Sequence, residues 1–237
     1  MKKCMALLLC LLFCFCAFAA AEEDTCPACG AKLGDNYCEN CGTAEPGTFC
    51  PGCGRLSLQR FCPACGAKLP APAAVYADIV IRDYGTVTFR LETEKAPITC
   101  ANFISLAESG FYNGLTFHRI IAGFMMQGGD PNGNGTGGSG RNIPGEFAIN
   151  GYNTGLSHTR GAVSMARASD PNSASSQFFI MHVDYPYLDG QYAVFGYVTE
   201  GMEVVDAVCA AAKPVDSNGT IPRAEQPVIE SVTIRYE

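Results

Sequence analysis

Residues 117–130 read FHRIIAGFMMQGGD, and the interpretation of the second half of the chain starts from this stretch. It predicts a strand that leads from Leu115–His118 into Arg119, followed by a second strand over Phe124–Gln127. An arginine beside apolar residues is commonly a surface residue that covers a hydrophobic edge. Whether Arg119 does more than that depends on which other segments accompany it.

The surrounding sequence adds short strands and few helices. In Thr86–Leu91, three apolar residues occupy one face and polar residues the other, which is typical of a half-buried strand. Pro97 begins one helix that stops at Gly110, and Met202–Ala211 is a second helix. Asp189-Gly190 predicts a hairpin turn. The remaining strands are expected at 77–82, 162–166, 178–181, 193–198 and 228–235.

Eight strands with two helices favour a mainly β fold over a βαβ sandwich. We therefore expect an eight-stranded, closed antiparallel β-barrel capped by the two helices.

The composition excludes several classes of protein. About half of the 237 residues are apolar (48%) and 16% are charged, which excludes a disordered chain. The formal net charge of −7 argues against a general affinity for nucleic acid or for an anionic membrane.

The first residues resemble a targeting segment. Lys2 and Lys3 precede an apolar run that ends near Ala21, and small residues then lead into acidic ones. This order predicts a signal peptide over 1–21. An uncleaved membrane anchor is the alternative, because about 18 apolar residues are the lower limit for a spanning helix. Either way the chain after Glu22 is expected outside the cytoplasm, secreted or associated with the cell envelope.

Residues 22–68 contain a repeat with a period of twelve residues, each copy opening with Cys-x-x-Cys-Gly. Each Cys-x-x-Cys turn supplies two thiolates to a tetrahedral zinc ion, so eight cysteines predict two structural zinc ions in a tandem zinc ribbon. The simplest grouping places four ligands on each ion: Cys26, Cys29, Cys38 and Cys41 on one, and Cys50, Cys53, Cys62 and Cys65 on the other.

Disulfides remain the alternative in this segment, because exported cysteine-rich segments are often oxidised. The segment is slightly acidic, so we expect it to dock a protein partner or act as a spacer, not to bind nucleic acid. Residues 69–74, rich in proline and alanine, read as a linker to a second domain over 75–237.

Several other patterns carry little chemistry. Residues 133–138 match GxGxxG, but no strand leads into them and a proline follows, so they predict a surface loop. The three histidines (His118, His158 and His182) are too scattered for a metal site, and each is interpreted as a hydrogen-bonded structural residue. Cys100 and Cys209 are expected to be buried packing residues.

Three ordered segments together resemble the cyclophilin family of peptidyl-prolyl cis-trans isomerases. They are FHRIIAGFMMQGGD (117–130), GAVSMARASDPNSASSQFFIM (161–181) and YPYLDGQYAVFG (185–196). The resemblance covers about 75–237. It implies that the chain isomerises X–Pro bonds in proline-containing polypeptides without a cofactor, and that it assists the folding of exported proteins.

The resemblance also implies a set of site residues. Its catalytic residues would be Arg119, Phe124 and Gln127. Its substrate-binding residues would be His118, Met125, Ala166, Arg167, Gln177, Phe179, Tyr187, Leu188 and Tyr192. Tyr187 stands where many members have tryptophan and Tyr192 where many have histidine, which puts tight cyclosporin binding in doubt.

A non-catalytic module is the second reading: a domain that holds proline-rich segments while the zinc ribbons dock a partner. The presence of Arg119, Phe124 and Gln127 favours catalysis, because a charged guanidinium can donate a hydrogen bond to the twisted amide nitrogen.

Overall fold

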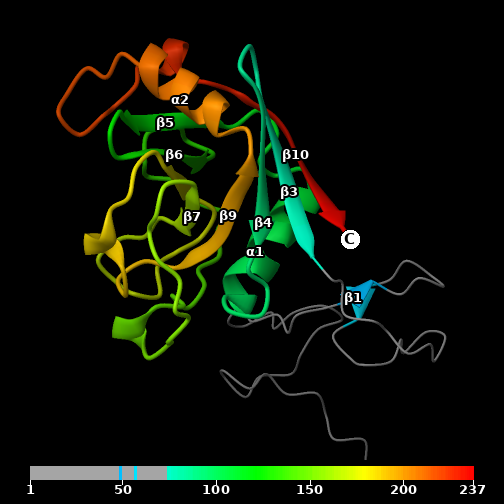
Figure 1. Ribbon diagram of the computed structural model, residues 1–237. Coiled ribbons are helices and arrows are strands. Elements are labelled where there is room, and N and C mark those ends of the chain that lie inside the picture. The colour runs from blue at the N-terminus through cyan, green and yellow to red at the C-terminus, as the bar shows by residue number, and fades with distance from the viewer. Residues whose placement is uncertain (1–47, 50–55, 58–73) are drawn as a thin grey trace, which may run out of the picture.

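A computed structural model describes residues 48–49, 56–57 and 74–237 (Figure 1). The predicted signal peptide, the eight cysteines of the repeat and the linker up to residue 73 lie outside these residues. Two short strands, β1 (Thr48–Phe49) and β2 (Leu56–Ser57), pair in antiparallel fashion. Within the described residues, no helix is long and apolar enough to cross a membrane.

The larger sheet contains eight antiparallel strands in the order β10-β3-β4-β9-β7-β8-β6-β5. Their bounds are β3 Val75–Ile81, β4 Gly85–Leu91, β5 Thr116–Ile121, β6 Met125–Asp130, β7 Ala162–Met165, β8 Phe178–Met181, β9 Val194–Glu200 and β10 Ile229–Tyr236. All eight strands were expected near these positions. The strand predicted over Phe124–Gln127 begins one residue later, because Phe124 belongs to the turn before β6.

The predicted closed barrel is wrong in one respect. The sheet curls into an open half-barrel with β5 and β10 as its edge strands, and a single isolated bridge joins Thr116 of β5 to Val228, the residue before β10. Backbone hydrogen bonds around this bridge, such as Ile229 N to Leu115 O (2.8 Å), tie the edges at one end only. Because the alternation of a strand does not encode its partner, closure could not be read from the strand patterns.

The core fills the inside of the half-barrel. On β3, every second residue is buried, as the period of a strand requires. Phe89, Phe103, Phe178 and Phe195 form its centre, with ring centroids of neighbouring pairs 5.2–6.0 Å apart. Such edge-on and tilted ring pairs add about 0.5–1.5 kcal/mol each beyond simple burial.

Two helices and three short 3-10 turns complete the domain. Helix α1 (Pro97–Glu108) and helix α2 (Met202–Ala211) lie toward opposite ends of the curled sheet in Figure 1. The turns are η1 (Ala148–Asn150), η2 (Pro186–Leu188) and η3 (Arg223–Glu225). Cys100 and Cys209 are both buried, as expected.

The predicted hairpin at Asp189-Gly190 is also wrong. The pair follows η2, not a strand, and β9 begins only at Val194. The segment is therefore a compact turn laid over the sheet, and this difference matters for the site below.

Candidate active site

One transverse row of the sheet supplies the site. Arg119 on β5 lies opposite Gln127 on β6, Gln127 lies opposite Phe179 on β8, and Phe179 lies opposite Ser164 on β7. Directly opposed residues on neighbouring strands place their side chains on the same face. Four distant positions of the sequence are thus brought together by register alone.

A β-bulge in β5 directs Arg119 to this face. Phe117 pairs with Gly128 and Arg119 with Gln127, so His118 is an extra residue in the strand. The extra residue lets Phe117 and Ile120 both face the core while Arg119, between them, faces the other way. Strict alternation would have placed Phe117 and Arg119 on one face.

Nine of the twelve residues that the resemblance implies surround one cleft of about 210 Å³. Four parts of the fold contribute: the β5–β6 pair, the end of β7, β8, and the turn before β9. The lining residues are Arg119, Phe124, Met125, Gln127, Ala166, Arg167, Phe179, Leu188 and Tyr192. Its lining combines five apolar side chains with polar groups, which are the guanidinium groups of Arg119 and Arg167, the Gln127 amide and the Tyr192 hydroxyl.

Arg119 is held at two of its nitrogens. Its Nε donates to the Asn218 carbonyl (2.7 Å) and its Nη1 to Gln127 Oε1 (3.2 Å). Within the described part of the chain, Nη2 donates to no protein group. Burial lowers the pKa of Arg119, although Tyr192 and Asp216 oppose that shift. An arginine is nevertheless protonated at any physiological pH.

Two glutamines form an amide relay, Gln127 and Gln177, that leads from Arg119 to the glycine-rich loop (131–138). Gln177 Nε2 donates to the carbonyls of Gly135 (3.1 Å) and Gly137 (2.8 Å). Carbonyls only accept, so Gln177 must turn its oxygen to Gln127 Nε2, which lies 2.9 Å away. Gln127 then presents its own oxygen to Arg119, and the loop fixes the polarity of the whole relay.

Asp130 holds the glycine-rich loop in place. Its carboxylate accepts the backbone N–H groups of Asn132, Asn134 and Gly135 at 2.6–3.0 Å. Burial raises the pKa of Asp130, but these hydrogen bonds outweigh it and the pKa is lowered overall. The loop is thus a structured support for the relay. The expectation that no strand leads into it is wrong, because β6 ends at Asp130, directly before the loop. No α-helix follows the glycines, however, as a dinucleotide-binding motif would require.

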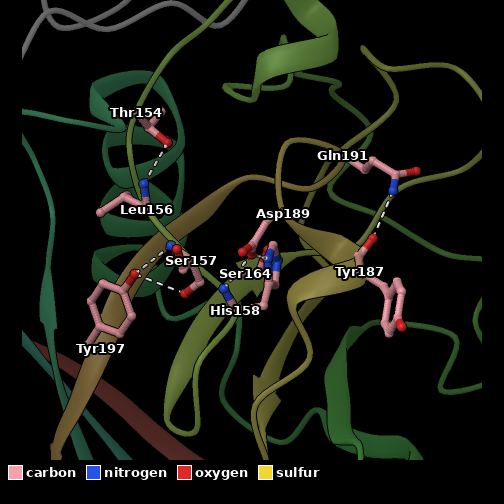
Figure 2. A network of polar contacts seen from close by, with 9 residues as sticks. All are labelled: Thr154, Leu156, Ser157, His158, Ser164, Tyr187, Asp189, Gln191 and Tyr197. Atoms are coloured by element: carbon pink, nitrogen blue, oxygen red, sulfur yellow. Dashed lines mark hydrogen bonds and ion pairs between the residues drawn. The ribbon is translucent and has the colours of Figure 1, made fainter.

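A buried histidine, His158, is the centre of a second polar cluster (Figure 2). His158 Nδ1 lies 2.8 Å from Asp189 Oδ1, and its Nε2 lies 3.1 Å from Ser164 Oγ. Because a carboxylate only accepts, Nδ1 carries the proton and the Ser164 hydroxyl donates to Nε2. The ring also stacks on Phe179, a cleft residue, with centroids 6.0 Å apart.

This constellation has the order of contacts found in a Ser-His-Asp triad, but it offers no nucleophile. Ser164 is 0% exposed and His158 is 1% exposed, so no substrate atom can reach the hydroxyl. Asp189 instead ties the turn that carries Leu188 to the sheet, since it also accepts the backbone N–H of His158 at 2.7 Å. We assign the cluster a positioning role.

The histidine interpretation holds for two of the three side chains. His158 is hydrogen-bonded as described, and His182 Nδ1 accepts the backbone N–H of Gly123 at 2.9 Å. His118 is 4% exposed, and neither of its ring nitrogens has a hydrogen-bond partner among the described residues. It does not line the cleft.

Two other implied residues also lie outside the lining. Gln177 acts through the relay, and Tyr187 is 79% exposed on the outer surface. Sequence reasoning missed Asn218, whose carbonyl anchors Arg119 from 99 residues away. No local signal could have found it, because any residue offers the same carbonyl.

The family model for cyclophilin-type peptidyl-prolyl cis-trans isomerases matches residues 76–234, about two thirds of the chain. This chain belongs to that family. The described domain is therefore a cyclophilin domain, and its activity is peptidyl-prolyl cis-trans isomerisation.

Relatives in bacteria and fungi carry the same name. The cyclophilin domain is 48% identical over 126 residues to a peptidyl-prolyl cis-trans isomerase of Helicobacter pylori, covering 52% of this chain and 74% of that protein. It is 48% identical over 124 residues to peptidyl-prolyl cis-trans isomerase B of Bacillus subtilis, covering 52% and 83%. A Neurospora crassa isomerase-like 1 protein is 44% identical over 154 residues, covering 65% and 91%.

A solved structure supports the fold. A cyclophilin of Cryptosporidium parvum, crystallised in the presence of the dipeptide Ala-Pro, is 34% identical to the present chain with a TM-score of 0.60. The match covers 68% of this chain and 99% of the other. Within the described residues of the present chain, no group of three or more His, Cys, Asp or Glu side chains is placed to hold a metal ion.

Proposed function

We propose that Arg119 and the apolar side chains of its cleft catalyse rotation about X–Pro bonds. The substrates would be polypeptides outside the cytoplasm. The observation that carries these catalytic roles is the Arg119 guanidinium, held at two nitrogens, in a cleft large enough for a proline ring. The Ala-Pro used with the Cryptosporidium cyclophilin supports a proline-containing peptide as the ligand.

The chemistry requires stabilisation of a twisted amide. An X–Pro bond resists rotation by about 20 kcal/mol because the nitrogen shares its lone pair with the carbonyl. At that barrier the rate is about 0.01 per second, and a rate of about 1,000 per second requires a barrier lower by roughly 7 kcal/mol. No covalent bond breaks, so neither a nucleophile nor a cofactor has to act.

Arg119 supplies the electrostatic part of this stabilisation. In the twisted state the nitrogen becomes pyramidal and its lone pair accepts a hydrogen bond. A charge-assisted hydrogen bond contributes about 1.5–3 kcal/mol, and more where water is excluded. Nη2 of Arg119 is available for it, while Nε and Nη1 keep the group in position.

The apolar side chains supply the rest by binding the proline in its twisted form. Phe124, Met125, Phe179 and Leu188 surround the position next to Arg119. Interactions stronger in the transition state than in the ground state are the ones that raise the rate. Ala166 and Arg167, at the end of β7, are placed to hold the substrate backbone extended.

Arg119→Ala tests the role directly. We expect kcat/KM for a proline tetrapeptide to fall at least a hundredfold, with an unchanged circular dichroism spectrum. Arg119→Lys retains charge but not the planar fork, so it should recover only part of the loss. An activity loss smaller than tenfold for Arg119→Ala would refute the assignment.

We place the enzyme outside the cytoplasm, joined to two structural zinc ions through residues 22–68. The antiparallel pairing of Thr48–Phe49 with Leu56–Ser57 supports a small hairpin, whose connecting sequence contains Cys50 and Cys53. In this arrangement Cys26, Cys29, Cys38 and Cys41 bind one ion, and the remaining four cysteines of the segment bind the other. The module would then dock a protein partner.

Mass and metal analysis of the protein recovered from outside the cytoplasm tests both points. We expect a chain that lacks about the first 21 residues and contains two zinc ions. Loss of mass at oxidised cysteines with no bound metal would instead establish disulfides. Cys100→Ala and Cys209→Ala serve as controls that leave the metal content unchanged, because both thiols are buried in the isomerase domain.

A further inference from the structure

Two exposed tyrosines form a surface that continues directly from the cleft. Tyr185 is 38% exposed and Tyr187 is 79% exposed, and they are two of only four large hydrophobic side chains that the described domain exposes. We call this pair the tyrosine ridge.

The ridge is joined to the cleft by ring contacts. The Tyr185 ring lies 4.7 Å from the ring of Phe124, a cleft residue, and the Tyr187 ring lies 5.8 Å from that of Tyr185. An extended chain advances about 3.3–3.6 Å per residue, so the ridge reaches two to three residues beyond the group bound at Phe124.

The backbone of the ridge is fixed although its rings are exposed. The Tyr185 N–H donates to the His158 carbonyl (2.7 Å), and Gln191 Nε2 donates to the Tyr187 carbonyl (2.8 Å). The Tyr187 ring points away from the buried His158–Asp189 cluster (Figure 2). The rings are therefore presented on a rigid support and contribute little to holding it.

From this continuity we infer that the tyrosine ridge is a substrate subsite that binds an aromatic side chain two or three residues from the isomerised proline. The inference rests on the proposed function of the cleft. Aromatic rings suit such a partner, because ring pairs prefer edge-to-face or offset contacts at 4.5–7 Å and tyrosine loses little conformational freedom on binding. The ridge lies beyond the rotating bond, so its contact lowers KM and leaves kcat unchanged.

A position scan of peptides tests the inference on the full chain. The peptides contain Ala-Pro in an otherwise serine and alanine sequence, with one phenylalanine moved over the three positions on each side. We expect kcat/KM to rise about three- to tenfold at one or two positions on one side only, two or three residues from the proline.

The variant Tyr185→Ser/Tyr187→Ser should remove this preference and bring the ratio of phenylalanine to alanine peptides below twofold. The matched control is Tyr76→Ser on β3, a strand that contributes nothing to the cleft, and it should keep the wild-type ratio. The main-chain hydrogen bonds of the ridge are retained in the double variant, so a folded protein is expected.

Equal rates at all six positions, with normal isomerisation of every peptide, would overturn the subsite and leave the proposed function intact. Isomerisation of none of the peptides would instead refute the proposed function. Self-association that the double variant abolishes, measured by sedimentation, would assign the ridge to a contact between copies and overturn the inference.

Discussion

The orientation of Arg119 depends on its neighbours. Among them, the two glutamines of the amide relay impose the most specific requirement, because each amide must point one way. Each glutamine could point either way in isolation, since the amide oxygen and nitrogen have nearly the same shape. The two loop carbonyls fix the orientation of the Gln177 amide. Gln177 in turn fixes the orientation of the Gln127 amide, which then turns its oxygen toward Arg119.

Gln177→Ala should therefore lower activity although Gln177 does not line the cleft. The Gln127 amide loses its acceptor and can turn its NH₂ group toward Arg119, where two donors repel. We expect kcat/KM to fall about tenfold through kcat, the effect of roughly 1.4 kcal/mol from one misplaced hydrogen bond. Stopped-flow or exchange NMR with a proline tetrapeptide measures it.

A double-mutant cycle separates positioning from general damage. If Gln177 acts only through Arg119, the variant Arg119→Ala/Gln177→Ala loses no more activity than Arg119→Ala alone. Additive losses would mean that Gln177 contributes independently of the guanidinium.

The buried histidines set a pH dependence of stability. Burial lowers the pKa of His158, although Asp189 opposes the shift, and burial likewise lowers the pKa of His118 against the opposing effect of Asp130. As the pH falls, the unfolded chain, with a histidine pKa of about 6.5, therefore takes up protons at a higher pH than the folded chain does. The stabilisation from neutral histidine is complete above about pH 6.5 and is lost as pH falls through the folded-state pKa.

Urea unfolding at pH 7.5, 6.5 and 5.5 measures this dependence. The free energy of unfolding of the wild type should decrease across the series, and His158→Gln should reduce the slope. The pKa of Asp130 is lowered, so this group stays ionised over the series, and the carboxylates common to both proteins cancel when their slopes are compared. Parallel slopes in the two proteins would contradict the assignment to His158.

At the scale of elements, the start of α1 shows how a distant residue completes a helix. The N-cap position, Ala96, has no side-chain acceptor, and Pro97 follows it. Glu146, 1% exposed, accepts the backbone N–H groups of Ile98 (3.1 Å) and Thr99 (2.7 Å) and the Thr99 hydroxyl. It therefore performs the work of a cap from outside the helix.

Glu146→Ala should lower the free energy of unfolding by about 2–3 kcal/mol, because two buried N–H groups lose their acceptor. Glu146→Gln keeps one acceptor oxygen and should recover at least half of that loss. Burial raises the pKa of Glu146 despite its hydrogen bonds with Thr99 and Ile98, so a neutral replacement is well tolerated there. Equal losses in the two variants, measured by urea unfolding, would show that capping is not the cause.

The same scale shows what sequence reasoning could and could not predict. Strand patterns such as that of Thr86–Leu91 gave the number and positions of the strands, because half-burial leaves an alternating signature. The bulge at His118 left no signature, so the face occupied by Arg119 followed only from the family resemblance. Asp189-Gly190 was misread because the same pair serves a hairpin and the turn after η2.

Long-range features were the hardest to foresee. The open edge between β5 and β10 and the Asn218 carbonyl at Arg119 depend on segments about a hundred residues apart. All nine cleft residues are among the twelve that the family resemblance implied, since three long motifs carry that resemblance, and their roles remain predictions. Tyr185 was missed because an exposed tyrosine in a turn has no pattern of its own.

At the scale of the whole molecule, the two ends of the isomerase domain are hydrogen-bonded to each other. Ala74 and Glu237, at its two ends, exchange both backbone hydrogen bonds at 3.0 and 2.9 Å. Strand β10 pairs with β3 along nearly its whole length, so the C-terminal strand anchors the beginning of the domain. Every residue of the cleft lies between positions 119 and 192.

Removal of metal should consequently leave catalysis intact while it unfolds the proposed zinc ribbons. None of the cleft residues is a cysteine, and Arg119, its anchors and the relay all belong to the described domain. We expect treatment of the full chain with a strong chelator to change kcat/KM for a proline tetrapeptide less than twofold.

The same treatment should release zinc and make residues 22–68 sensitive to protease, because structural zinc supplies most of the folding energy of such small modules. The matched variant Cys50→Ser/Cys53→Ser should lose zinc and keep activity in the same way. A parallel loss of zinc and of isomerase activity would show that the N-terminal module completes the active site. It would contradict the view that the domain between Ala74 and Glu237, whose ends are hydrogen-bonded, is self-contained.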